Sequence, residues 1–189
     1  MIKFLKMYMK KYFIFIPILL IIIAIPVTLI LINKNKGEKE NTESTQQEQE
    51  EKNNDPEGTI YVEAGAGTLS TSDSFSYIKE SARGLEAYLA GKGASAIYDV
   101  VSEESGKYTL YVKLTDDGLY TPGTRDVTII INNFKTLAYK HTPEDTKGWK
   151  WYEIGETPIN RGSNTIVFTK NEDTAGAYVM DEFKLIPVK

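Results

Sequence analysis

Three patterns of hydrophobic and polar residues follow one another along this chain of 189 residues. Residues 13–32 form a run without a charged residue that is almost entirely apolar, residues 33–58 hold no aromatic or aliphatic side chain, and from residue 59 onward apolar and polar positions alternate. At about 1.5 Å of rise per residue, a helix over the apolar run reaches about 30 Å, the thickness of a bilayer's hydrocarbon core. The run therefore predicts one transmembrane helix at 13–32, bent at Pro17 and Pro26.

Charged residues flank this run unequally. The segment that follows it mixes lysine with glutamate, whereas no acidic residue precedes it. Since positively charged flanks stay inside the cell, we expect residues 1–12 to be a cytoplasmic stub and the chain after Ile32 to be extracellular. The expected location is the cell membrane, with a single pass through the lipid bilayer. The basic residues of the stub are Lys3, Lys6, Lys10 and Lys11.

A cleaved signal peptide is the alternative interpretation of the same run. Such a peptide has a shorter apolar core, which ends in small residues at the cleavage site. Here the apolar residues continue through 28–32 into Asn33 without such a site, and the chain has no cysteine that could carry a lipid after cleavage. The pattern favours a retained signal-anchor.

The polar tract at 33–58 carries four lysines and eight acidic residues. A segment of this composition buries too little apolar surface to offset the conformational entropy of the chain, so we expect a disordered linker. As a flexible coil, it has a root-mean-square span of about 25–30 Å. Binding of a cationic partner to its glutamates is the alternative to a plain spacer.

Period-two alternation dominates residues 59–189 and predicts an all-β fold. Within 107–114, Tyr108 and its alternate residues share one face, while Thr109, Tyr111 and Lys113 share the other. Short turns between strands favour one antiparallel β-sandwich. A helix-like stretch at 77–88 is weakened by Gly84. The predicted strands are 59–64, 95–101, 107–114, 126–132, 149–154, 164–169 and 177–185.

Composition excludes several classes of function. The formal net charge is −4 and no basic cluster occurs in 59–189, which argues against nucleic acid as a partner. Without cysteine there are no disulfides or thiolate metal sites. His141 is the single histidine, and it supports neither a zinc site nor a catalytic triad. Adjacent carboxylates such as Asp116 and Asp117 are expected in solvated turns, so we predict no enzyme activity.

The order of short motifs in 59–189 resembles the jelly-roll carbohydrate-binding modules of families 6 and 35 and related galactose-binding-like sandwiches. Tyr-Val-Glu-Ala stands near the start, and a hydrophobic strand that contains Asp181 stands at the end. The motifs between them are Ala-x-Tyr-Asp-Val, Glu-Ser-Gly-Lys-Tyr-Thr-Leu-x-Val, Gly-Trp-x-Trp and Gly-x-Asn-Thr-Ile. The resemblance covers nearly all of 59–189 and implies a jelly-roll sandwich.

In this family an early Glu-Ala-Glu and an aspartate of the last strand hold a structural calcium ion. The resemblance assigns the first glutamate to Glu63 and the aspartate to Asp181, while Gly65 stands at the second glutamate position. Calcium requires six to eight oxygen ligands, so backbone carbonyls would have to complete the site. The alternative is that both carboxylates lie on neighbouring terminal strands and face water or a basic partner.

The resemblance also implies a glycan site, because sugars stack their C–H faces on aromatic rings. It places Trp149 at the family's Gly-Trp position, Tyr77 or Tyr88 as a second ring, and Asn171 as a polar contact. Many relatives have Trp-x-x-Trp, but here Trp149 and Trp151 are two residues apart. This spacing puts both indoles on one face of a strand, and we expect at least one to belong to the core.

Two functions remain after these exclusions. The first is a membrane-anchored extracellular glycan-binding module without catalytic activity, with exposed aromatic rings. The second is a structural or adhesion sandwich domain that acts through protein contacts in the cell envelope and buries its tryptophans. Because one fold serves many functions, the resemblance alone does not choose between them.

Overall fold

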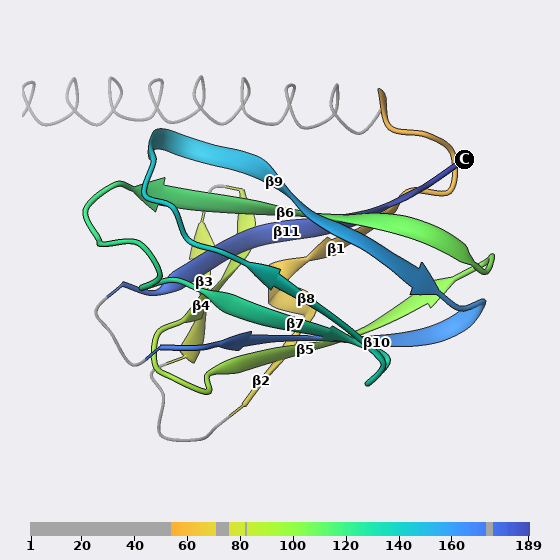
Figure 1. Ribbon diagram of the computed structural model, residues 1–189, viewed down its shortest axis with the longest axis horizontal. Coiled ribbons are helices and arrows are strands. Elements are labelled where there is room, and N and C mark those ends of the chain that lie inside the picture. The colour runs from red at the N-terminus through yellow and green to blue at the C-terminus, as the bar shows by residue number, and fades with distance from the viewer. Residues whose placement is uncertain (1–53, 71–75, 82, 173–175) are drawn as a thin grey trace, which may run out of the picture. The chain divides into compact units, whose positions relative to one another are not determined.

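Two antiparallel β-sheets face each other in a computed structural model that describes residues 54–70, 76–81, 83–172 and 176–189 (Figure 1). Side chains of 145–147 are also outside this description. The predicted cytoplasmic stub and transmembrane helix lie outside the described residues, as does nearly all of the predicted linker. Within the ranges given above, no helix is long and apolar enough to cross a membrane.

Sheet A contains β3, β4, β11, β6 and β9 in that order, and β1 also pairs with β11. Sheet B has the order β2, β5, β10, β7, β8, and one 3-10 turn, η1 (Ala64–Ala66), connects β1 to β2. The strands are β1 (Ile60–Glu63), β2 (Thr68–Leu69), β3 (Ser76–Ser81), β4 (Gly84–Leu89), β5 (Ser95–Ser102), β6 (Gly106–Asp117), β7 (Val127–Ile131), β8 (Lys135–Tyr139), β9 (Asp145–Ile159), β10 (Gly162–Lys170) and β11 (Tyr178–Pro187).

The core lies between the sheets and follows the predicted alternation. Along β6, the four apolar residues from Tyr108 to Leu114 are buried at every second position, which confirms the predicted face. An aromatic group occupies the centre: the Tyr98 ring meets Phe168 edge-on at 5.7 Å and Phe183 at 5.0 Å. All residues of this core belong to 64–185, within the compact unit Glu51–Lys189. This unit therefore contains what it needs to fold on its own.

The helix-like prediction at 77–88 is wrong, because these residues form the hairpin β3–β4. Gly84 has φ of +135°, which no helix accommodates, and the chain reverses just before it. Tyr77 and Tyr88 become direct cross-strand partners. In Figure 1 these short strands stand at a steep angle to the long strands of sheet A. The sequence pattern also missed β8, which follows the predicted turn at Asn132.

Candidate functional site

The outer face of sheet A, turned away from the core, carries aromatic and charged side chains in rows. Outward residues of β6 stand in register with outward residues of β1, β11 and β9. Such cross-strand neighbours lie close enough to interact directly. One row contains Tyr61, Lys184, Tyr111 and Glu153, and the next contains Glu63, Glu182, Lys113 and Trp151.

Trp149 and Trp151 both lie on this outer face, and both are half-buried. The expectation that at least one of them belongs to the core is therefore wrong. The reason is that alternate residues of β9 point to opposite faces of the sheet. Tyr152 points toward the core, where the centre of its ring lies 5.5 Å from that of Tyr139. Residues on either side of it must then face outward.

A chain of contacts connects Trp149 to the hairpin β3–β4. The Arg83 guanidinium lies 4.8 Å from the centre of the Trp149 ring. Arg83 Nη2 is 3.3 Å from Glu86 Oε1, and the Tyr88 hydroxyl donates to Glu86 Oε2 at 3.0 Å. Tyr88 stacks on Tyr77 with centroids 4.6 Å apart. We call these five residues the Trp149 cluster; it unites three of the four sequence-predicted ligand residues.

Burial and charge determine which side chains of this cluster are accessible and how they are protonated. The Glu86 side chain is 4% exposed, whereas that of Arg83 is 33% exposed and thus reachable from solvent. Burial and the hydrogen bond to Glu86 raise the pKa of Tyr88 to about 12, so its hydroxyl stays a donor at neutral pH. Tyr77 is 48% exposed, and its ring stacks on that of Tyr88. The cluster thus offers aromatic surface beside the partly exposed guanidinium of Arg83, while the Glu86 carboxylate that holds Arg83 is buried.

Sequence reasoning missed Arg83 and Glu86. Interpreted as a hairpin, 77–88 would have put Tyr77 opposite Tyr88 and Arg83 in the turn between them. The helical interpretation concealed this arrangement. The signal was present in Gly84, which is unfavourable in a helix and suited to a turn.

Asn171 is held by sheet B. Thr128 Oγ1 on β7 donates to Asn171 Oδ1 at 2.8 Å, and the Asn171 N–H donates to the Asp126 carbonyl at 3.0 Å. These bonds fasten the start of the β10–β11 loop to the start of β7. Asn171 therefore lies in a loop beside sheet B, whereas the Trp149 cluster belongs to sheet A.

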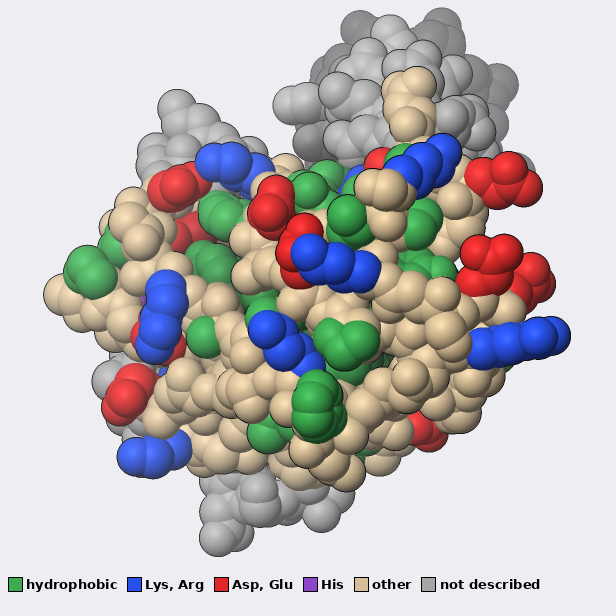
Figure 2. All heavy atoms as spheres, turned by 45° about the vertical axis from the view of Figure 1, so that its right-hand side comes forward, with side chains coloured by type: hydrophobic (Ala, Val, Ile, Leu, Met, Phe, Trp, Pro, Cys, Tyr) green, Lys and Arg blue, Asp and Glu red, His purple; other side chains and the backbone are tan. Residues whose placement is uncertain are grey.

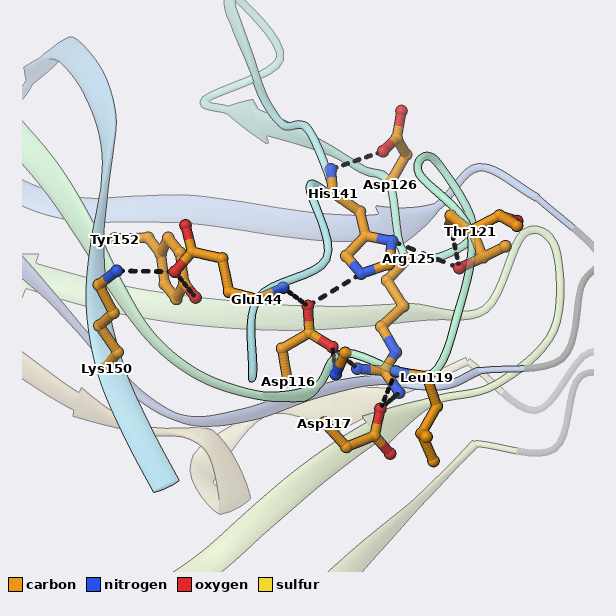
Figure 3. A network of polar contacts seen from close by, with 12 residues as sticks. Asp116, Asp117, Leu119, Thr121, Arg125, Asp126, His141, Glu144, Lys150 and Tyr152 are labelled. Atoms are coloured by element: carbon orange, nitrogen blue, oxygen red, sulfur yellow. Dashed lines mark hydrogen bonds and ion pairs between the residues drawn. The ribbon is translucent and has the colours of Figure 1, made fainter. Parts of the chain in front are cut away.

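A network of polar contacts surrounds Asp116, which lies near the end of β6 (Figure 3). Its carboxylate is 2.6 Å from Arg125 Nη1 and 3.0 Å from His141 Nε2. Asp116 is 4% exposed, so the predicted solvated turn is wrong for this residue. Although Thr124 Oγ1 lies 3.3 Å from His141 Nδ1, the His141 side chain is 0% exposed and closed to substrates. The network holds the 118–126 and 140–144 loops together.

Ionisation of Asp116 contributes to stability. Burial alone would raise its pKa, but backbone N–H groups of Gly118 and Glu144, then His141 and Arg125, together hold the pKa below its ordinary value. A depressed folded-state pKa stabilises above the unfolded-state value of about 4, and this stabilisation is lost as pH falls through the folded-state pKa.

We therefore expect Asp116→Asn to lower the free energy of unfolding by about 2 kcal/mol at pH 7, since hydrogen bonds to charged groups are lost. The difference between variant and wild type should shrink as pH falls below about 4. Urea unfolding followed by circular dichroism from pH 7 to acid measures both. A difference that stays constant across this range would contradict the assignment.

The two predicted calcium ligands lie on neighbouring strands, because Glu63 pairs in register with Glu182, which follows Asp181. Asp181 Oδ2 is 3.1 Å from Lys113 Nζ. Within the described part of the chain, no three His, Cys, Asp or Glu side chains form a group suited to a metal ion. The calcium site stays a prediction, and these residues fit it poorly, since a cation already contacts Asp181.

Gly65, at the family's second glutamate position, packs against β4. A Cβ atom at residue 65 would lie 2.1 Å from the Leu85 Cβ. Because a Cβ follows the backbone, η1 and β4 could not keep their present distance. Close backbone packing explains why a glycine, and no acidic ligand, stands here.

A hollow of about 680 Å³ lies away from the Trp149 cluster, between the segment that leads into β1 and the turn that connects β5 to β6. Its lining includes Tyr61, Val101, Glu57 and Glu104. The sequence-predicted ligand residues are not among those that line it.

Comparison with known proteins identifies the fold. No family model matches the sequence, and no curated protein matches it. A family 35 carbohydrate-binding module from Clostridium thermocellum superimposes with a TM-score of 0.55 and 18% identity, covering 67% of this chain and 98% of the module. The match thus extends over nearly the whole of that module.

Two enzymes match over a part of their length. A GH26-CBM35 β-(1,4)-mannanase from Podospora anserina gives a TM-score of 0.52 at 19% identity, covering 71% of this chain and 28% of the enzyme. An exo-β-1,3-galactanase from Phanerochaete chrysosporium gives 0.54 at 18%, covering 67% of this chain and 29% of the enzyme. At these identities the likeness shows the two-sheet sandwich and nothing finer.

Proposed function

We propose that this protein is a non-catalytic carbohydrate-binding module of the jelly-roll type, which binds a glycan at the Trp149 cluster. The observation that carries the proposal is the position of Trp149: a half-buried indole on the outer face of sheet A, joined to two tyrosines through Arg83 and Glu86. The match to nearly all of a family 35 module supports the proposal.

The cluster has the groups that sugar recognition uses. A pyranose ring stacks its C–H face on an aromatic ring, and its hydroxyls pair with charged side chains at the edge. Arg83 covers one face of the Trp149 ring and fixes the indole in place. The ring and the exposed part of Arg83 then receive the sugar without a large rearrangement.

We expect this site to bind a sugar weakly and without cleaving it. Glu86 is the carboxylate of the Trp149 cluster. Its side chain is 4% exposed and contacts Arg83 and Tyr88. Glycoside hydrolysis requires two accessible carboxylates on either side of the bond. Binding without cleavage is the function that this geometry supports.

A second function, adhesion through protein contacts in the cell envelope, is favoured by different residues. Phe134 in the β7–β8 turn is 84% exposed, and Val101 on β5 is 72% exposed. In Figure 2 hydrophobic side chains lie between acidic and basic ones. Exposed apolar residues that lie singly are common on protein surfaces, so these two residues support adhesion less than the contacts of the Trp149 cluster support the glycan module.

A glycan array tests the proposal with the fragment 51–189, which contains the whole core. We expect binding to at least one polysaccharide class, with no release of reducing sugar on prolonged incubation. A folded fragment that binds no glycan on the array would reject the module and favour the adhesion function.

We also propose that residues 13–32 anchor the domain in the cell membrane with residues 33–189 outside. The support is the sequence pattern, in which lysines without acidic residues precede the apolar run. Protease added to intact cells should therefore degrade the domain. Survival of residues 59–189 on intact cells, with degradation after lysis, would reverse the topology.

A further inference from the structure

Lys113 lies between two buried carboxylates on sheet A. Its side chain is 8% exposed, and its Nζ atom is 3.1 Å from Asp181 Oδ2 and 3.2 Å from Glu182 Oε1. The two acidic side chains are 3% and 4% exposed. An ammonium group that faces two carboxylates at these distances holds β6 against β11 by charge.

A β-bulge in β11 makes this arrangement possible. Met180 pairs with Leu114 and Glu182 pairs with Lys113, so Asp181 is an extra residue on β11. In a regular strand, successive side chains point to opposite faces. The bulge breaks that rule and lets two consecutive carboxylates reach the same ammonium group.

Two close carboxylates that are withheld from water need a cation. A lysine side chain can be this cation, and so can a divalent metal ion that binds carboxylate oxygens. The family resemblance assigns a calcium ligand to Asp181, whereas the structure gives Asp181 a lysine partner. Trp151, whose ring centre is 5.9 Å from Lys113 Nζ, lies beside the same cation.

We propose that Lys113 takes the place of a divalent cation between Asp181 and Glu182. The native domain therefore does not depend on calcium. Removal of the lysine charge converts the two carboxylates into a calcium site. This inference does not rest on glycan binding.

Thermal unfolding of fragment 51–189, in millimolar calcium chloride or in chelator, tests the inference. The wild-type midpoint should agree within about 1 °C between the two conditions, since no ion binds the native state preferentially. Lys113→Met should unfold at a much lower temperature in chelator, and calcium should raise its midpoint by about 5 °C or more. A calcium-dependent midpoint of the wild type would overturn the proposal.

Two further variants separate charge from packing. Lys107→Met removes an exposed lysine of the same strand, paired with Glu156, and should change neither the midpoint nor its calcium response. Lys113→Met combined with Asp181→Asn and Glu182→Gln should recover part of the lost stability and give no response to calcium. A calcium response that persists in this triple variant would place the ion elsewhere and contradict the inference.

Calorimetric titration keeps the test decisive should Lys113→Met fail to fold in chelator. Wild-type fragment titrated with calcium chloride should give no saturable heat, and a saturable heat would overturn the proposal. Lys113→Met should then fold on addition of calcium, because binding to the native state alone shifts the equilibrium toward it. A variant that stays unfolded in calcium rejects the latent site.

Discussion

Replacement of Trp149 by alanine is expected to weaken glycan binding by about 2 kcal/mol or more, roughly 30-fold, while the domain stays folded. The indole is half-buried on the outer face of sheet A and absent from the core. Its removal takes away the stacking surface and the group on which Arg83 rests. Isothermal titration with a glycan identified on the array measures the loss, and circular dichroism follows folding.

The matched control is Phe134→Ala. Phe134 is 84% exposed in the β7–β8 turn of sheet B, so its loss removes an exposed ring without touching sheet A. Both affinity and stability should stay at the wild-type level. If Trp149→Ala lowers the free energy of unfolding by about 3–5 kcal/mol, as the loss of a core aromatic residue does, the indole supports the fold. Equal affinities of wild type and Trp149→Ala would remove it from the site.

Gly65→Glu, which restores the acidic residue of the family pattern, is expected to destabilise the domain by about 3 kcal/mol or more and to create no calcium site. The added Cβ would meet Leu85 Cβ at 2.1 Å. Since neither atom can rotate away, η1 and β4 must separate. Urea unfolding of the fragment 51–189 with and without calcium measures the change in free energy.

A double-mutant cycle tests the cause. Gly65→Ala alone should destabilise, and combined with Leu85→Gly it should cost less than the sum of the two single changes, because the clashing atom is gone. Gly106→Ala is the control, since its Cβ would meet Tyr108 at an ordinary 3.5 Å. Additive losses in the cycle would mean that the clash with Leu85 does not limit residue 65.

Local sequence pattern determined most of the strands and the faces of β6. Alternation needs only the two-residue period of an extended chain, so Tyr108 and Thr109 could be assigned to opposite faces without knowledge of any partner strand. The same local logic failed at 77–88, where spacing alone does not separate a short helix from a hairpin. The positive φ at Gly84 decided that segment in favour of the hairpin.

Contacts between distant segments were decided by the tertiary structure alone. Sequence pattern indicated that Trp149 and Trp151 share a face, but the inward position of Tyr152 settled that this face is the outer one. Strand order brings Arg83 onto Trp149 and His141 onto Asp116. A bulge of one residue brings Asp181 to Lys113. Strand order and bulges depend on the packing of the whole sandwich, which no local period encodes.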